Sequence, residues 1–284
     1  MSPRRWHFHS LAGRVDVTWM LLHDRRVGVR TYLPPDYEWT DRSYRVLYMF
    51  DGHNLFDVRT STYNQEWQID ETMERLAAEG REPAIVVGID APFDKFARYA
   101  MYTIGTWDYR TRPDRRTVRH IVGDGEATAA FLLEEVKAAT EAQYRVRTDR
   151  DGVGVAGSSM GGYMALYSAT KYASLVGKAI AMSPVVLVAP MRDSGLRDYL
   201  LAAGAAYPQR IWIDMGDNEE LAYIESPQQL VDNMWQVRDV LTMMGHRDVA
   251  AHVVAGGDHT ERSWAARFER AYRWAFDGVE PTWP

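Results

Sequence analysis

Cysteine is absent from this chain of 284 residues. Without thiols the protein has no disulfide framework, no thiol nucleophile, and no zinc or iron–sulfur site built on thiolates. An excess of positive charge is also lacking, because 33 Lys and Arg stand against 39 Asp and Glu, a formal net charge of −6. This balance offers no electrostatic surface for nucleic acid or anionic membranes, and we expect neither as a partner. Any catalysis must therefore use oxygen nucleophiles, carboxylates or imidazoles.

Long uninterrupted apolar runs are lacking too. The most apolar stretch, residues 179–191, is broken by Ser183 and Pro184 and is shorter than the roughly 20 residues that span a bilayer. Arg4 and Arg5 stand near the start with no apolar segment behind them, so no targeting signal is recognisable. We therefore expect a cytoplasmic protein.

The composition is that of an ordinary globular domain, with 46% apolar and 25% charged residues. Aromatic residues are abundant, with 10 Trp and 16 Tyr. Most should lie in the core, and exposed ones are compatible with a homo-oligomer. No Ser/Gly-rich linker or shift in composition divides the chain, which favours one domain over residues 1–284.

Short apolar strands alternate with amphipathic helices along most of the chain. Residues 15–20 and 27–33 alternate between apolar and polar, which predicts two half-buried strands that pair antiparallel. Apolar runs predict further strands at residues 44–50, 84–89, 152–156, 179–182, 211–215 and 250–254. Helical periodicity predicts helices at residues 69–78, 128–144, 160–172, 192–203, 227–244 and 261–276. This order predicts an α/β fold whose mostly parallel sheet is covered by helices on both faces.

Residues 91–125 show no clear periodicity, and we expect a long loop there. A loop of that length in a compact domain is usually functional. It carries Arg98 and Tyr99, which we expect, together with Trp67, to contact a substrate. The alternatives are that the rings only pack in the core and that Arg98 is solvated.

A Gly-x-Ser-x-Gly sequence, GSSMG with its central serine at Ser159, follows the predicted strand 152–156 and opens the helix 160–172. This is the context that the nucleophile elbow of an α/β-hydrolase requires. The tight turn places Ser159 at the carboxyl edge of the sheet, where the helix N-terminus favours developing negative charge. We therefore predict that Ser159 is a nucleophile.

The same segment contains a Gly-x-Gly-x-x-Gly match at Gly152, Gly154 and Gly157. A dinucleotide site needs these glycines in the turn after a strand, with an acidic residue about 20 positions on. Here the first two glycines lie inside the predicted strand and the acidic residue is missing. We therefore reject nucleotide binding and expect no organic cofactor.

A serine hydroxyl needs a base, and in an α/β-hydrolase the chain order is serine, acid, histidine. His259 follows the last predicted strand and precedes a helix, which is the expected place for the base. Three acidic residues follow the strand 211–215. We favour Glu219 as the acid, with Asp217 as runner-up and Glu220 facing solvent; the spacing alone does not decide between them.

The oxyanion hole of such a site needs two backbone N–H groups. One comes from Met160, the residue after the nucleophile. We expect the other from His53, in the Asp51-Gly52-His53-Asn54 turn after the strand 44–50. The alternative is that this segment is only a β-turn.

Longer stretches carry a family resemblance, namely YLPPDY (residues 32–37), VLYMFDGHNLFD (46–57), EWQIDETMERL (66–76), GVAGSSMGGYMAL (154–166) and GGDHTERSW (256–264). The chain resembles the putative-esterase branch of the α/β-hydrolases, which includes enterochelin, feruloyl and acetyl esterases, S-formylglutathione hydrolases and mycolyltransferases. The resemblance implies an α/β-hydrolase fold. It also implies His53 as an oxyanion donor, His259 as the base with Trp264 behind it, and Glu219 as the acid. Asp217 departs from the family pattern, which has a small hydroxyl residue there.

These features predict a serine carboxylesterase that acts through an acyl-enzyme on a small acyl, sugar or phenolic ester. The chemistry needs no metal and no organic cofactor, and the expected partner is the small-molecule ester. One alternative is acyl transfer to a sugar or alcohol acceptor by the same triad. The other is a catalytically silent binding protein on a hydrolase fold, against which the Ser159 and His259 pair argues.

Overall fold

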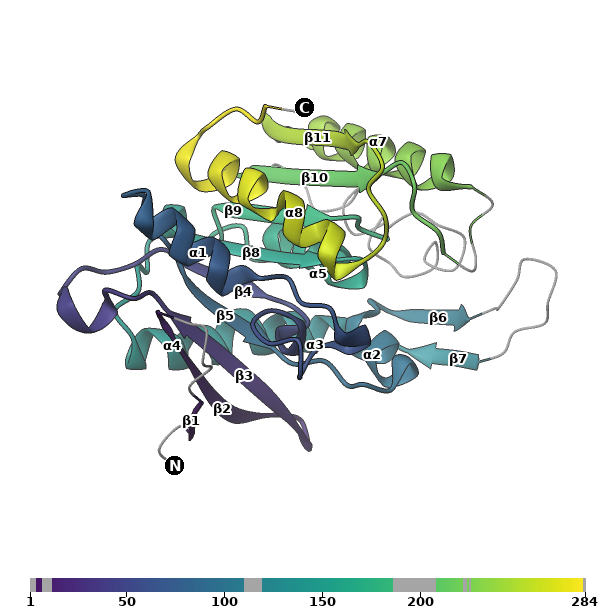
Figure 1. Ribbon diagram of the computed structural model, residues 1–284. Coiled ribbons are helices and arrows are strands. Elements are labelled where there is room, and N and C mark those ends of the chain that lie inside the picture. Colours follow the sequence, from purple (N-terminus) through teal and green to yellow (C-terminus); the bar gives the residue numbers. More distant parts are fainter. Residues whose placement is uncertain are drawn as a thin grey trace.

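The computed structural model describes the backbone of residues 4–6, residues 12–109, 119–185 and 208–221, residue 224, and residues 226–282. Within them nine strands form one sheet in the order β1-β2-β3-β5-β4-β8-β9-β10-β11 (Figure 1). Strands β1 (Arg4–Trp6), β2 (Arg14–Leu22) and β3 (Arg25–Leu33) pair antiparallel, and β3 joins β5 (Ile85–Ile89) in the same sense. From β5 onward the pairing is parallel. The strands of this part are β4 (Val46–Met49), β8 (Val153–Ser158), β9 (Lys178–Met182), β10 (Arg210–Gly216) and β11 (Asp248–Val254).

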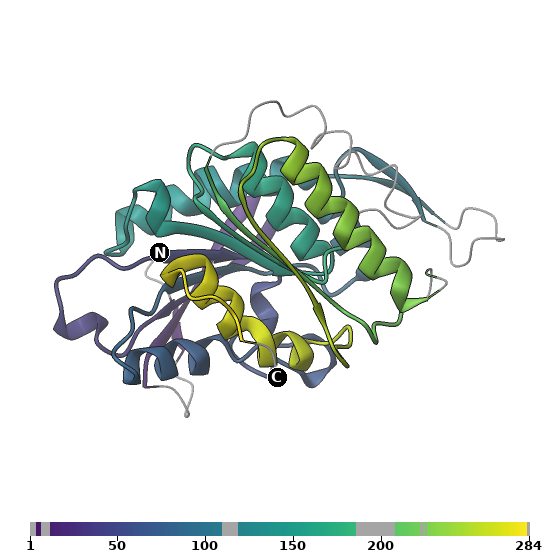
Figure 2. The same ribbon diagram turned by 90° about the horizontal axis from the view of Figure 1, so that it is seen from above.

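Helices cover both faces of the sheet, as expected for the α/β-hydrolase fold. Figure 2 shows α1 (Ile69–Ala78) and α8 (Glu261–Tyr272) on one face, and α5 (Met160–Lys171) and α7 (Pro227–Met243) on the other. Helix α1 buries Ile69, Met73 and Leu76 completely, and each such side chain contributes roughly 1.5–3 kcal/mol. Among the described helices, none has the length and apolar character needed to cross a membrane.

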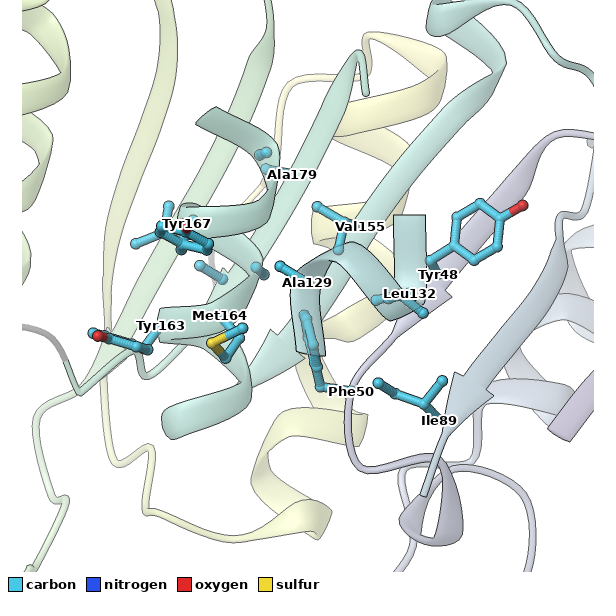
Figure 3. Close-up of a cluster of buried hydrophobic side chains, with 14 of the residues drawn as sticks. Tyr48, Phe50, Ile89, Ala129, Leu132, Val155, Tyr163, Met164, Tyr167 and Ala179 are labelled. Atoms are coloured by element: carbon cyan, nitrogen blue, oxygen red, sulfur yellow. The ribbon is translucent and has the colours of Figure 1, made fainter. Parts of the chain in front are cut away.

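The larger core lies between the sheet and the helices of the second face (Figure 3). Val155 from β8 and Phe50 after β4 meet Leu132 and Met164 from the covering helices. Leu132 belongs to one continuous helical segment made of α3 (Gly125–Ala130), a π-helical stretch (Phe131–Val136) and α4 (Lys137–Gln143). The expected helix 128–144 is therefore present, with an earlier start and a π-helical middle.

The expectation of a long loop at residues 91–125 is wrong for its described part. It contains α2 (Lys95–Tyr102) and a hairpin of β6 (Thr106–Tyr109) and β7 (Arg119–Val122). Asp94 caps α2, because its Oδ1 accepts a hydrogen bond of 2.8 Å from the Ala97 N–H. Rings of the helix pack against rings of the hairpin: Tyr99 lies 5.2 Å from Trp107 between centroids. The helix expected at residues 192–203 lies outside the described residues.

The parallel strands end at one edge of the sheet. The segments that follow β4, β8, β10 and β11 carry His53, Ser159, Glu219 and His259, respectively. In open α/β sheets this carboxyl edge is where ligands bind. The fold therefore gathers four expected site residues from distant parts of the sequence.

Candidate active site

Ser159 is the single residue between the end of β8 and the start of α5. Its backbone angles are φ 55° and ψ −123°, a conformation that non-glycine residues rarely adopt. Glycines make this turn possible: a Cβ atom on Gly157 would lie 2.4 Å from the carbonyl oxygen of Gly161. The Ser159 N–H is held by the carbonyl of Met182 at 3.0 Å. The strain thus presents the Ser159 hydroxyl at the carboxyl edge of the sheet.

Three side chains form one hydrogen-bond chain. His259 Nε2 lies 2.9 Å from Ser159 Oγ, and His259 Nδ1 lies 2.8 Å from Glu219 Oε2. Because the carboxylate accepts from Nδ1–H, Nε2 is free to accept the serine proton. Glu219 has no exposed surface, whereas Asp217 is exposed and accepts a 2.7 Å hydrogen bond from the Gly256 N–H. The structure therefore places Glu219 against the histidine and Asp217 away from it.

A buried network stands behind Glu219. Its Oε1 accepts from the Gly216 N–H at 2.8 Å and from the Ser183 hydroxyl. Ser183 in turn accepts from Trp264 Nε1 at 2.9 Å and from Arg267 Nη2 at 2.7 Å.

Arg267 extends this network to a second acid. Its Nε donates to Asp214 Oδ1 at 3.0 Å, and both residues are buried. Burial raises the pKa of Asp214, and Arg267 counteracts part of that rise. Sequence reasoning missed Arg267 and Ser183. The signals were an arginine on the apolar face of the last helix, beside Trp264, and a serine that interrupts an apolar run of the sequence directly after β9.

Two backbone N–H groups, those of Met160 and His53, belong to residues that line the same cavity as Ser159. Met160 is the first residue of α5, and His53 lies in the short helical turn Gly52–Asn54 that follows Asp51 at φ 57°. This turn packs closely, since a Cβ on Gly52 would lie 2.6 Å from the carbonyl carbon of Gly88. Within the described residues, the N–H groups of His53 and Met160 have no acceptor. They are therefore available as hydrogen-bond donors at this edge of the sheet.

The His53 side chain is buried and structural. Its Nδ1 accepts from the Ala91 N–H at 3.4 Å, and its Nε2 lies 3.1 Å from Thr62 Oγ1. Burial lowers the pKa of His53, so the ring is neutral and donates from Nε2 to Thr62. These contacts hold the turn that carries the His53 N–H.

Arg98 forms an ion pair with Asp51, the residue that precedes the helical turn Gly52–Asn54. Its Nε and Nη2 donate to the two Asp51 oxygens, each at 2.8 Å, in a bidentate pair. Burial would raise the pKa of Asp51, but the charge and hydrogen bonds of Arg98 outweigh it and the pKa is lowered. The guanidinium therefore stabilises the turn that carries His53, and its Nε and Nη2 donors are already used by a protein carboxylate.

A cavity of about 330 Å³ opens at these groups. Arg98 and Tyr99 line it, and their contact with a substrate stays a prediction. The expectation for Trp67 is wrong: its side chain is 2% exposed and packs on Trp264 and Phe268 in the core.

The other lining residues of the cavity include Asp51, His53, Asn54, Tyr63, Phe93, Lys95, Ser159, Met160, Leu221, His259 and Glu261. Sequence reasoning missed Tyr63, Phe93 and Glu261, of which Glu261 could have been noticed two positions after His259.

The comparison with protein families decides the membership of this chain. The family described as putative esterase matches residues 22–275. The chain belongs to this family and is an esterase. It is also 22% identical over 261 residues to the uncharacterized protein YbbA of Bacillus subtilis, a match that covers 90% of the chain and 96% of that protein.

Solved structures share the fold of this esterase. The siderophore hydrolase EstB from Aspergillus nidulans aligns with a TM-score of 0.69 at 18% identity, over 99% of this chain and 100% of that one. A ferulic acid esterase from Anaeromyces mucronatus aligns with a TM-score of 0.62 at 18% identity, over 96% and 94% of the two chains. At these identities the likeness concerns the fold, so the substrate must be argued from the cavity.

Proposed function

We propose that this esterase is a serine carboxylic-ester hydrolase that acts through an acyl-enzyme. The observation that carries the proposal is the unbroken hydrogen-bond chain from Ser159 through His259 to Glu219, at 2.9 and 2.8 Å. A nucleophile and base within hydrogen-bond reach, with a third group orienting the base, is the general arrangement for covalent catalysis by serine.

Acylation begins when Ser159 Oγ attacks the ester carbonyl carbon while His259 Nε2 takes its proton. Glu219 holds the Nδ1–H and stabilises the imidazolium that forms. The oxyanion accepts hydrogen bonds from the N–H groups of His53 and Met160, and the N-terminus of α5 favours its charge. As the tetrahedral intermediate collapses, His259 gives its proton to the leaving alcohol and the acyl group stays on Ser159.

Deacylation repeats these steps with water. His259 takes a proton from the water that attacks the acyl-enzyme, and then returns it to Ser159 Oγ as the carboxylic acid leaves. When a sugar or alcohol takes the place of water, the product is a new ester. Product analysis with an added acceptor separates hydrolysis from transfer.

The cavity fits a small acyl, sugar or phenolic ester. Its volume of about 330 Å³ is near the lower end for small-molecule sites. Two exposed rings line it, Tyr63 with 83% and Phe93 with 76% of its surface exposed. Such rings can stack on a planar or sugar ring of the substrate.

Turnover of 4-nitrophenyl acetate and butyrate by wild-type protein and Ser159→Ala tests the proposal. We expect the variant to lose hydrolysis and labelling by a fluorophosphonate while keeping its circular dichroism spectrum. Ser168→Ala is the matched control, since Ser168 is a fully buried serine further along α5. Equal activity of Ser159→Ala and wild type contradicts the proposal.

A further inference from the structure

A second acidic side chain lines the catalytic cavity besides the paired Asp51. Glu261 is the first residue of α8, two positions after His259, and it shares the cavity with Ser159. The residue is only 9% exposed. Its Oε1 accepts a hydrogen bond of 3.1 Å from Asn54 Nδ2.

Glu261 differs from Asp51 in lacking a cation. Within the described residues, Arg98 pairs with Asp51, but no Lys, Arg or His nitrogen forms an ion pair with Glu261. Its Oε2 has no hydrogen bond to another described side chain. Among the described donors the Glu261 carboxyl thus interacts with the Asn54 amide and its own backbone N–H, and since it lines the cavity it keeps acceptor capacity for a ligand.

The charge of Glu261 changes near neutrality. Burial is the largest cause and raises its pKa to about 7; its own N–H at the helix terminus lowers it, Asp51 raises it and Arg98 lowers it. The other titratable groups that line the cavity are the neutral His53, the catalytic His259, the phenols of Tyr63 and Tyr99, and Lys95, which is exposed. The carboxyl is therefore neutral in mild acid and an anion in mild base.

The geometry points to Glu261 as a substrate-contacting residue that selects against esters bearing an anionic group. This inference rests on the proposed ester hydrolysis at Ser159. An ionised Glu261 repels a carboxylate bound in the same partly desolvated cavity, whereas it accepts a hydrogen bond from a hydroxyl or amide group. A protonated Glu261 has no such repulsion and donates a hydrogen bond instead.

Two pairs of isosteric esters test this inference, one for each side of the ester bond. On the alcohol side the pair is 4-carbamoylphenyl butyrate against 4-carboxyphenyl butyrate. On the acyl side it is 4-nitrophenyl 4-carbamoylbenzoate against 4-nitrophenyl 4-carboxybenzoate. The measured quantity is the ratio of kcat/KM for the neutral ester to that for the anionic ester between pH 5.5 and 8.5. Because both members use the same triad, the pH dependence of the triad itself cancels in this ratio.

In wild-type protein we expect the ratio to rise with pH by roughly 10-fold to 100-fold in at least one pair, with a midpoint near 7. In Glu261→Gln, which keeps an oxygen for Asn54 and cannot ionise, the ratio stays constant with pH. The control is Glu220→Gln, because Glu220 is exposed and does not line the cavity; it should behave as wild type.

A ratio that is independent of pH in both pairs, or that changes equally in wild type and Glu261→Gln, overturns the inference while the esterase assignment stands. Absence of turnover for all four esters overturns the proposed function, and this inference with it. Should Glu261→Gln not fold, Glu261→Asp replaces it. That variant keeps the charge but draws it back from the cavity, so the rise in the ratio should shrink.

Discussion

The hydroxyl of Ser183 donates a hydrogen bond to Oε1 of Glu219, the carboxylate oxygen that does not face His259. Ser183 has φ 46°, a left-handed conformation that is unusual for a residue with a side chain. The strain orients the hydroxyl between Glu219 and two donors, Trp264 and Arg267. Ser183 thus acts through the acid and keeps Oε2 available to the histidine.

Ser183→Ala should lower kcat by roughly 10-fold to 100-fold, because Glu219 loses a donor and two buried donors lose their acceptor. We also expect the acid side of the pH profile of kcat/KM to move. The groups that face Glu219 are Ser183, Arg267 and His259, with Asp214 behind Arg267.

Ser168→Ala serves as the matched variant, since it also removes a fully buried hydroxyl. It is expected to leave both kcat and the pH profile unchanged. A Ser183→Ala enzyme that is less stable but has an unaltered pH profile would show that Ser183 is only structural.

The identity of the catalytic acid gives a second prediction. Glu219→Gln should lower kcat by about 10³-fold to 10⁴-fold, as loss of the orienting carboxylate does in serine proteases. Asp217→Asn is the paired control, because its side chain is exposed and an amide oxygen can still accept from the Gly256 N–H. Steady-state kinetics on 4-nitrophenyl butyrate separates the two. A large loss in Asp217→Asn with an active Glu219→Gln would reverse the assignment.

Arg98 gives a third prediction, concerning stability. Arg98→Gln leaves the buried carboxylate of Asp51 without its cation, which should cost about 3–5 kcal/mol of unfolding free energy. The double variant Asp51→Asn with Arg98→Gln should recover part of this loss, because no carboxylate is then left buried without its cation. Urea unfolding of the three proteins measures the effect. If Arg98 instead bound a substrate carboxylate, Arg98→Gln would raise KM for anionic esters and leave the unfolding free energy unchanged.

The Gly-x-Ser-x-Gly motif and the order of strands, turns and helices were enough to predict that Ser159, Met160 and His259 lie at one edge of the sheet, because these positions depend on the motif and on chain order. The choice between Glu219 and Asp217 depends on side-chain direction. The tight turn after β10 brings Glu219 Oε1 back to the Gly216 N–H at 2.8 Å, a contact that spacing does not reveal.

The position of Trp67 and the presence of helix α2 could not be predicted from local sequence patterns. Gln68 has φ 52°, so the chain turns there, and Trp67 packs on Trp264 and Phe268 of α8 instead of lining the cavity. Helix α2 has only 8 residues, too few for its amphipathic pattern to stand out within residues 91–125. Rings of β6 and the helices α3 and α5 pack against it, and such contacts between separate elements do not show in the periodicity of the helix itself.

Glu261 gives the last prediction, which links the cavity to stability. Its pKa is about 7 in the folded protein against an ordinary 4.5, so the folded state binds more protons than the unfolded state between these values. The contribution of Glu261 to the unfolding free energy is therefore highest below pH 4.5 and is lost as the pH rises through 7. At pH 8, Glu261→Gln should therefore be more stable than wild type, by on the order of 3 kcal/mol.

Thermal or urea unfolding of Glu261→Gln at pH 8 and pH 5 checks the sign of this effect. The gain over wild type should be clear at pH 8 and small at pH 5, while Glu220→Gln should differ little from wild type at either pH because its side chain is exposed. An equal effect of Glu261→Gln at both pH values would contradict the linkage. A buried carboxyl that costs stability at neutral pH is the trade-off expected where a residue is retained for binding. The stability measurement and the substrate ratio thus test the same ionisation by independent means.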